Sequence, residues 1–191
     1  YEIAQCLVGS EMCIRDRNCT ADSMEFLERA MTAQELGAGG IMAAPGLLGL
    51  SIIRELSSAP DFHLPIFLHP CFSGPLVLSA DSGVSPFCYY GQFSRLAGAD
   101  AAIFTSFGGR FPFTEEVCRK ICDGTETEMG GLRSIFPVPS GGMKWQLFKK
   151  MVQVYGPDAI FLVGGALLTE SDDLTANMHF YFEKLNEAVN K

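Results

Sequence analysis

Phe136-Pro-Val-Pro-Ser-Gly-Gly-Met-Lys-Trp145 joins a short apolar run to the start of a helical pattern, with Ser140-Gly-Gly142 between them. Two glycines at such a junction serve either a tight turn or a close approach of the backbone to a ligand. This stretch alone leaves both alternatives open. Its order of apolar run, glycine loop and helix decides the fold, because the same order recurs along the chain.

Five continuous apolar runs predict five strands, and continuous runs are typical of parallel strands covered on both faces. The predicted strands span residues 40–45, 64–70, 100–107, 132–138 and 159–163. Helical spacing and cap residues predict a first helix at the capping box 22–25, and later helices at 48–56, 86–96, after Thr114, at 144–155 and at 172–190. We therefore expect an α/β protein of about five βα units after a leading helix.

Two architectures fit this order: an open doubly wound sheet, and part of an eight-stranded barrel. Five units suffice for the open sheet but fall short of a barrel unless upstream units are missing. The run from Cys6 to Arg17, CLVGSEMCIRDR, resembles a translated sequencing-adapter peptide of the kind found at the ends of metagenomic gene fragments. We therefore expect residues 1–17 to be non-native and the gene to begin upstream of Asn18. Residues 18–191 are then the C-terminal part of a (β/α)8 TIM barrel, truncated at its N-terminus.

The composition excludes several classes of partner. With 191 residues and 48% hydrophobic content, the chain can bury a sizeable core as one domain. A formal net charge of −8 argues against nucleic acid or an anionic membrane held by bulk charge. The apolar runs are shorter than the roughly 20 residues that a membrane helix needs. The seven cysteines include no CxxC pair. Cys118 and Cys122, one helical turn apart beside Val117 and Ile121, are interpreted as core thiols, which suits a reducing cytoplasm.

Polar or glycine-rich segments follow four of the predicted strands, at the ends where active groups gather in parallel α/β proteins. They are His69 and residues 106–110, 140–142 and 164–165. Glycine backbones after the last two strands of a barrel commonly present N–H groups to a phosphate. We therefore predict that Ser140, Gly141, Gly142, Gly164 and Gly165 bind a phosphate. The alternative is that these glycines only make tight turns.

His69 and Arg110 are the candidate catalytic residues. A histidine at a strand end before proline is either a packing residue or a reacting group, and the residues alone leave both open. Arg110 follows two glycines and is either a solvated loop residue or a clamp for a substrate phosphate or carboxylate. The acidic pair Asp172 and Asp173 is interpreted as the cap of the last helix and not as a metal site.

Taken in order, the strand ends resemble the C-terminal barrel of the RuBisCO large-chain superfamily, and most closely its RuBisCO-like (form IV) branch. The resemblance covers about residues 20–190 and rests on FLHPCFSG (67–74), RLAGADAAIFTSFGGRF (95–111), FPVPSGGM (136–143) and FLVGGAL (161–167). It implies that the predicted strands are strands four to eight of the barrel. It also implies that 140–142 contact a substrate phosphate and hydroxyl, and that the amides of Gly164 and Gly165 hold a phosphate. His69 then lies near the reacting carbons, and Arg110 takes the place of a loop lysine.

Three departures from the carboxylating members narrow the expected function. At Arg110 a planar guanidinium group stands where the carboxylating members have the compact ammonium group of a lysine. Pro70 stands where those members have a phosphate-binding arginine, and the strand at 100–107 lacks the histidine expected for a second phosphate. One phosphate site is thus retained. The resemblance implies Mg²⁺-assisted enolisation of a sugar monophosphate or keto-sugar-acid phosphate, by an isomerase, tautomerase or decarboxylase, and not CO2 fixation.

Other functions remain open. They are a true ribulose-bisphosphate carboxylase, an unrelated aldolase-type barrel, and a non-catalytic paralogue that binds a sugar phosphate. No predicted strand core carries the lysine that a Schiff base needs, which disfavours the aldolase type. The family's Mg²⁺ ligands, a carbamylated lysine and neighbouring carboxylates, lie on strand two, upstream of the residues present, so no residue of this chain is assigned as a metal ligand. Because the family builds its site at a homodimer interface with an N-terminal domain, we expect the full-length protein to be a homodimer and this chain alone to be inactive.

Overall fold

The computed structural model describes residues 16–79, 81–109 and 111–190, and within them five parallel strands form one sheet in chain order. The strands are β1 (Asp16–Asn18), β2 (Gly40–Ala43), β3 (Ile66–Leu68), β4 (Ala101–Thr105) and β5 (Phe136–Ser140). Every pairing in the sheet is parallel. Parallel neighbours in chain order, with helices between them, confirm the predicted α/β class and the barrel-type succession of strands.

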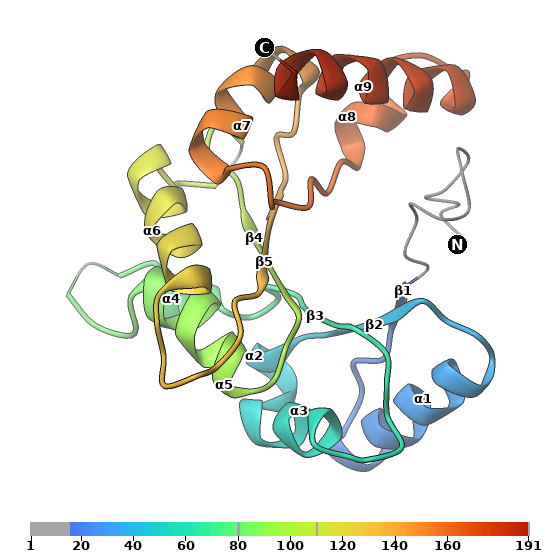
Figure 1. The fold of residues 1–191 in the computed structure, drawn as a ribbon, viewed down its shortest axis with the longest axis vertical. Helices are drawn as coiled ribbons and strands as arrows, with labels where there is room; N and C mark the ends of the chain where they lie inside the picture. The colour runs from blue at the N-terminus through green and yellow to red at the C-terminus, as the bar shows by residue number, and fades with distance from the viewer. Residues whose placement is uncertain (1–15, 80, 110, 191) are drawn as a thin grey trace.

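The helices cover one side of this sheet. They are α1 (Ser23–Glu35), α2 (Pro45–Leu48), α3 (Leu50–Ser57), α4 (Gly74–Val77), α5 (Ser94–Leu96), α6 (Glu115–Glu126), α7 (Phe148–Tyr155), α8 (Gly165–Leu168) and α9 (Leu174–Val189). A π-helix, η1 (Phe87–Phe93), precedes α5, and a 3-10 turn, η2 (Trp145–Leu147), precedes α7. Figure 1 shows the helices in an arc around the sheet, with α6 near its middle. The strands therefore line the inside of the arc, as in part of a barrel.

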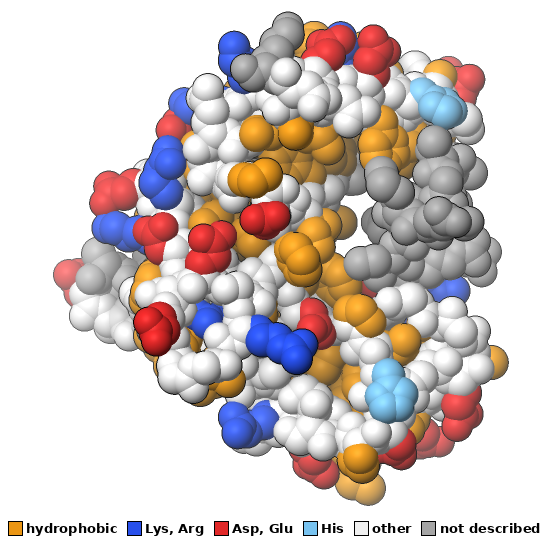
Figure 2. Space-filling model, viewed as in Figure 1, with side chains coloured by type: hydrophobic (Ala, Val, Ile, Leu, Met, Phe, Trp, Pro, Cys, Tyr) orange, Lys and Arg blue, Asp and Glu red, His pale blue; other side chains and the backbone are white. Residues whose placement is uncertain are grey.

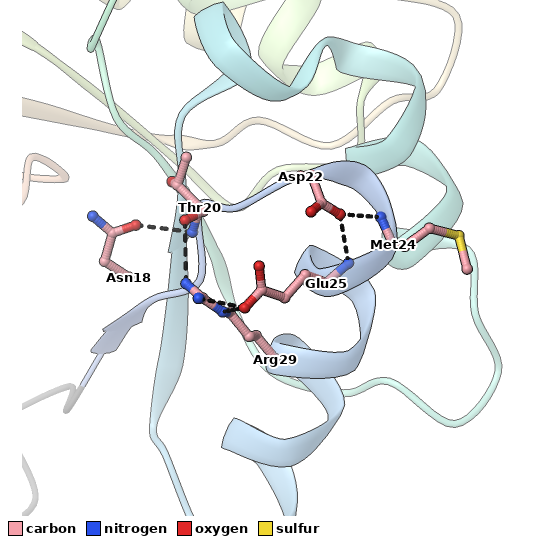
Figure 3. Close-up of polar contacts among 6 residues, drawn as sticks. All are labelled: Asn18, Thr20, Asp22, Met24, Glu25 and Arg29. Atoms are coloured by element: carbon pink, nitrogen blue, oxygen red, sulfur yellow. Dashed lines mark hydrogen bonds and ion pairs between the residues drawn. The ribbon is translucent and has the colours of Figure 1, made fainter.

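Helix starts follow the predicted caps. The Asp22 carboxylate accepts hydrogen bonds from the N–H groups of Met24 and Glu25 over 3.1 and 3.0 Å (Figure 3). Glu25 does not complete the capping box, because its carboxylate accepts instead from the Nε of Arg29 over 3.0 Å. Arg29 also donates to the carbonyl oxygen of Thr20, which fastens α1 to the segment after β1 (Figure 3).

The two other predicted caps are also present. Thr114 accepts from the N–H of Val117 at the start of α6, and Asp173 accepts from the N–H of Ala176 at the start of α9. Each cap satisfies one backbone donor that the first turn of a helix leaves without a partner. The interpretation of Asp173 as a helix cap is confirmed.

Side chains alternate between the two faces of the sheet. On the outer face Phe104 packs in a cluster with residues of α6, α7 and α9, and Ile41 and Ile66 pack with residues of α1 and α3. On the inner face a separate cluster contains Phe67, Ala101, Ile103 and Val138, with Met42, Ile160 and Leu162 half-buried against it. Figure 2 shows apolar side chains exposed along the inner side of the arc. This period of two decides which residues at the strand ends point inward.

The sheet differs from the prediction at both edges. At one edge, Asp16 and Arg17 belong to β1, which pairs with β2 and was not among the predicted strands. That residues 1–17 are non-native stays a prediction, and residues 1–15 lie outside the described part of the chain. At the other edge, the predicted strand 159–163 forms only a single bridge, Ser140 to Leu162. Strand 132–138 is also displaced, since β5 begins at Phe136.

Two prolines of β5 explain why residues 159–163 pair so little with that strand. The N–H groups of Ile160 and Leu162 donate to the carbonyl oxygens of Pro137 and Pro139, over 3.0 and 3.2 Å. In a strand, the N–H and C=O of one residue face the same neighbour, so these two prolines face the 159–163 segment. Proline has no N–H to return. Half of a regular ladder is therefore missing there.

A buried arginine stabilises the helices and loops on the outer face of the sheet. Arg95 is 4% exposed, and its guanidinium donates to four backbone carbonyl oxygens at the end of α6 and in the loop before β5. Those acceptors belong to Gly124, Thr127, Leu132 and Arg133. The loop that leads into β5 thus depends on one side chain for several of its hydrogen bonds.

Two features of the chain bear on the predictions from its composition. Cys118 and Cys122 are buried, as predicted for core thiols. Within the described residues, no helix combines the length and the apolar character that crossing a membrane requires.

We predict that Arg95→Met lowers the free energy of unfolding by about 3 kcal/mol, because it leaves buried carbonyl oxygens without donors. Arg54→Met is the matched control: Arg54 is exposed and donates only to the Leu96 carbonyl among the bonds described, so its loss should cost about 0.5 kcal/mol or less. Urea unfolding of both variants measures the difference. Equal losses would contradict the role given to Arg95.

Candidate active site

Three polar residues occupy the inner face at the carboxyl ends of the strands. His69, Thr105 and Ser140 each lie two positions beyond an inner-face apolar residue, namely Phe67, Ile103 and Val138. Because side chains alternate with a period of two, these polar residues face the same side as the inner cluster. Thr105 was not among the predicted site residues. The alternation of Ile103 and Thr105 in the apolar run was the signal that could have found it.

The two predicted phosphate loops begin side by side. Ser140 bridges Leu162, so Gly142 and Gly164 each lie two residues beyond the paired positions. Gly164 and Gly165 are exposed, and a β-carbon added to either would meet no atom within 4 Å. The backbone at this place is therefore open to a ligand. The structure brings the predicted residues 140–142 and 164–165 together at one edge of the sheet.

A third glycine loop lies against the first. Gly142 has a φ of +69°, and a β-carbon added there would lie 2.5 Å from the Cα of Gly109. Only glycine fits both the conformation and the space. The N–H of Ser106 donates to the carbonyl oxygen of Ser140 over 2.7 Å, and the Ser140 hydroxyl donates to the carbonyl oxygen of Phe104 over 3.0 Å. These contacts hold the loop after β4 against the loop after β5.

Arg110, the second predicted catalytic residue, directly follows this contact but lies outside the described residues. Its catalytic role therefore stays a prediction.

His69 is held as a neutral ring at the end of β3. Its backbone N–H donates to Ala43, and its Nδ1 accepts from the N–H of Cys71 over 3.1 Å. Burial lowers the pKa of His69 from its ordinary value of 6.5. An Nδ1 that accepts a hydrogen bond leaves the proton of the neutral imidazole on Nε2. His69 therefore presents a hydrogen-bond donor at physiological pH.

Comparison with known proteins identifies the family, although no family model matches the chain. A 5-methylthioribulose-1-phosphate isomerase from Rhodospirillum rubrum is 36% identical over 155 residues, which are 79% of this chain and 38% of that protein. A 2,3-diketo-5-methylthiopentyl-1-phosphate enolase from Exiguobacterium sibiricum is 32% identical over 155 residues, 81% of this chain and 39% of that protein. The crystal structure of a RuBisCO-like protein from Alicyclobacillus acidocaldarius matches with a TM-score of 0.81 at 28% identity, over 91% of this chain and 46% of that chain.

The chain belongs to the RuBisCO-like branch of the RuBisCO large-chain superfamily. The resemblance read from the strand ends is thus confirmed, as is the assignment of the fold to the C-terminal part of a (β/α)8 barrel. The relatives are named as an isomerase and an enolase, so this is a family of enzymes. The chain spans less than half the length of the relatives it matches.

The described residues of this RuBisCO-like chain do not fit a metal ion. Among residues 16–79, 81–109 and 111–190, no three His, Cys, Asp or Glu side chains gather in a group that could hold one. Mg²⁺ dependence accordingly stays a prediction for the full-length protein. Among the described residues at this edge of the sheet, the polar groups that a ligand could meet are the backbone amides, the His69 ring and the hydroxyl groups of Thr105 and Ser140.

We predict that the His69 imidazole titrates with a midpoint below 6.5, because burial disfavours its charged form. The unfolded chain then binds a proton at higher pH than the folded chain, so the free energy of unfolding falls as the pH drops below about 6.5. NMR titration of the ring protons measures the midpoint, with His69→Gln to assign the signal. The same variant should remove this part of the pH dependence. A midpoint at or above 6.5 would contradict the neutral ring.

Proposed function

We propose that the complete protein binds a sugar monophosphate and moves a proton next to its carbonyl group, as an enolase- or isomerase-type enzyme. The observation that carries this proposal is the bridge between Ser140 and Leu162, which starts the loop at 140–142 beside the loop at 164–165; a β-carbon at Gly141, Gly164 or Gly165 would meet no atom within 4 Å. A chain with a net charge of −8 cannot hold an anion by its overall field. Local N–H donors are therefore the groups that hold the phosphate.

The phosphate site consists of the backbone amides at 140–142 and 164–165. Gly165 is the first residue of α8, and its N–H precedes the first hydrogen bonds of that turn. Such donors satisfy phosphate oxygens by charge-assisted hydrogen bonds. The exposed glycines allow the oxygens to approach the backbone without meeting a side chain.

His69 supplies the group that acts on the carbonyl. Its Nε2–H is placed to donate to a substrate oxygen, which stabilises the negative charge that develops when the neighbouring carbon loses its proton. Loss and return of a proton beside a carbonyl is common to the isomerase and enolase reactions for which the relatives are named. The two reactions differ in the atom to which the proton returns. Arg110 remains the proposed loop contact to the substrate.

A single phosphate is favoured over two. The two relatives are named for substrates with one phosphate, on a five-carbon skeleton that carries a methylthio group. In this chain Pro70 and the strand at 100–107 lack the basic groups that the carboxylating members use for a second phosphate. The proposed substrate class is therefore a methylthio-substituted sugar monophosphate, and CO2 fixation on a bisphosphate is disfavoured.

Three further predictions accompany this proposal. The complete enzyme is expected to need Mg²⁺, whose ligands lie outside this chain, and to form a homodimer. It is also expected to act in the cytoplasm.

Calorimetric titration of the chain with ribulose 5-phosphate and with ribulose 1,5-bisphosphate tests the phosphate count. We expect both to bind through one phosphate with affinities within about threefold, since a second phosphate finds no charge-assisted donors. A bisphosphate that binds more than about tenfold tighter would correspond to at least one additional charged contact and would contradict the single site.

Gly165→Pro tests the backbone donor directly. Proline is tolerated at the first position of a helical turn but has no N–H. We expect phosphate affinity to fall about tenfold or more, the effect of losing one hydrogen bond to a charged group. Gly165→Ala is the matched control: it keeps the N–H, and its β-carbon meets no protein atom within 4 Å, so it should bind phosphate more tightly than Gly165→Pro. Equal affinities for folded Gly165→Pro and Gly165→Ala would refute the assigned donor.

A further inference from the structure

A buried group of three polar side chains lies beneath the phosphate loops. Ser106, Cys118 and Tyr155 are 1%, 0% and 3% exposed. The hydroxyl groups of Ser106 and Tyr155 are 2.7 Å apart and share a hydrogen bond. The Cys118 thiol, from α6, donates to the carbonyl oxygen of Thr105 and contacts the Tyr155 hydroxyl. None of these residues belongs to the predicted site.

Tyr155 contacts the segments that lead into two of the three glycine loops, at 107–109 and at 164–165. Its ring lies 5.9 Å from that of Phe104 in β4 and 5.7 Å from that of Phe107 in the following loop. It also packs edge-on against Phe161, at 6.2 Å, in the segment that leads to Gly164. The third loop, at 140–142, is reached through Ser106.

Ser106 connects Tyr155 to the loops through the backbone. Its hydroxyl bonds to Tyr155, while its N–H donates to the carbonyl oxygen of Ser140. Gly109 follows three residues later and lies against Gly142. A shift of Ser106 would therefore move both partners of the close glycine contact.

Burial favours the neutral, protonated form of this group at physiological pH. Burial raises the pKa of the Tyr155 hydroxyl and that of the Cys118 thiol above their ordinary values. Both groups stay protonated and neutral. Their contribution is geometric.

We propose that Tyr155 is a positioning residue that, through Ser106, fixes the loop at 107–109 against the loop at 140–142 and so sets the affinity for phosphate. This inference rests on the proposed phosphate site. Preorganised donors bind an anion more tightly because less conformational freedom is lost on binding. Tyr155 thus sets the spacing of the loops and does not itself contact the phosphate.

The chain contains a matched pair for comparison. The hydroxyl groups of Ser73 and Tyr90 are also 2.7 Å apart and buried, at the loop after β3. Tyr90 likewise packs on Phe104, with ring centroids 6.3 Å apart. Its serine partner, however, binds the carbonyl oxygen of Pro70, next to His69, and not the glycine loops. Tyr90→Phe therefore removes the same kind of hydrogen bond without loosening the phosphate loops.

The experiment measures the affinity of the folded chain for inorganic phosphate by NMR titration. Tyr155→Phe should weaken binding about two- to tenfold, the range of one net hydrogen bond, while Tyr90→Phe should leave it unchanged. Ser106→Ala should weaken binding at least as much as Tyr155→Phe, because the Ser106 hydroxyl also donates to the carbonyl oxygen of Phe107 over 3.2 Å. The double variant should lose no more than Ser106→Ala, because the two changes remove one shared bond. A purely structural role would lower stability in both tyrosine variants and give no such selectivity.

Two outcomes overturn the proposal separately. Wild-type binding with an unchanged Tyr155→Phe, or an equal loss in Tyr90→Phe, would refute the positioning role and leave the phosphate site standing. Absence of phosphate binding by the wild type would refute the phosphate site itself, and the positioning role with it.

Discussion

The parallel pairing of β4 with β5 is the constraint on which both the core and the site depend. Five residue pairs, from Ala101 with Phe136 to Thr105 with Ser140, fix the register of the two strands. A slip of one residue would turn Val138 away from the inner cluster and Ser140 toward the outer layer. The register that buries the inner apolar residues is thus the one that places the site residues at its end. Packing and function at this pair of strands cannot be changed independently.

The next segment along the sheet is held in a different way. Because Pro137 and Pro139 return no N–H groups, residues 159–163 gain only two ladder bonds from β5. Side-chain packing compensates: Phe161 lies against Phe148 and Tyr155 on the outer face. The segment that leads to Gly164 and Gly165, proposed as half of the phosphate site, is therefore held largely by aromatic contacts from α7, those of Tyr155 among them.

Much of this organisation could be predicted from the sequence, because its signals are local. Continuous apolar runs located β2, β3, β4 and the start of β5, and short polar residues located the helix caps at Asp22, Thr114 and Asp173. Strand ends are where function gathers in parallel sheets, so His69 and the glycine loops could be chosen from the sequence. The weak last strand was also visible in principle, because prolines at alternate positions of FPVPS face one neighbour.

Other features depend on contacts between distant residues. The Ser106–Tyr155 hydrogen bond joins positions 49 residues apart, and neither residue carries a local signal of the other. The approach of Gly142 to Gly109 follows from the register of two strands and not from either glycine pair alone. The edge strand β1 was missed because Asp16 and Arg17 belong to the run 6–17 that resembles an adapter peptide. Amide correlation spectra recorded while inorganic phosphate is added test most directly whether these glycine loops bind phosphate. We predict saturable shifts at Gly141, Gly142, Gly164 and Gly165, whereas saturable shifts confined to other amides would contradict the proposed site.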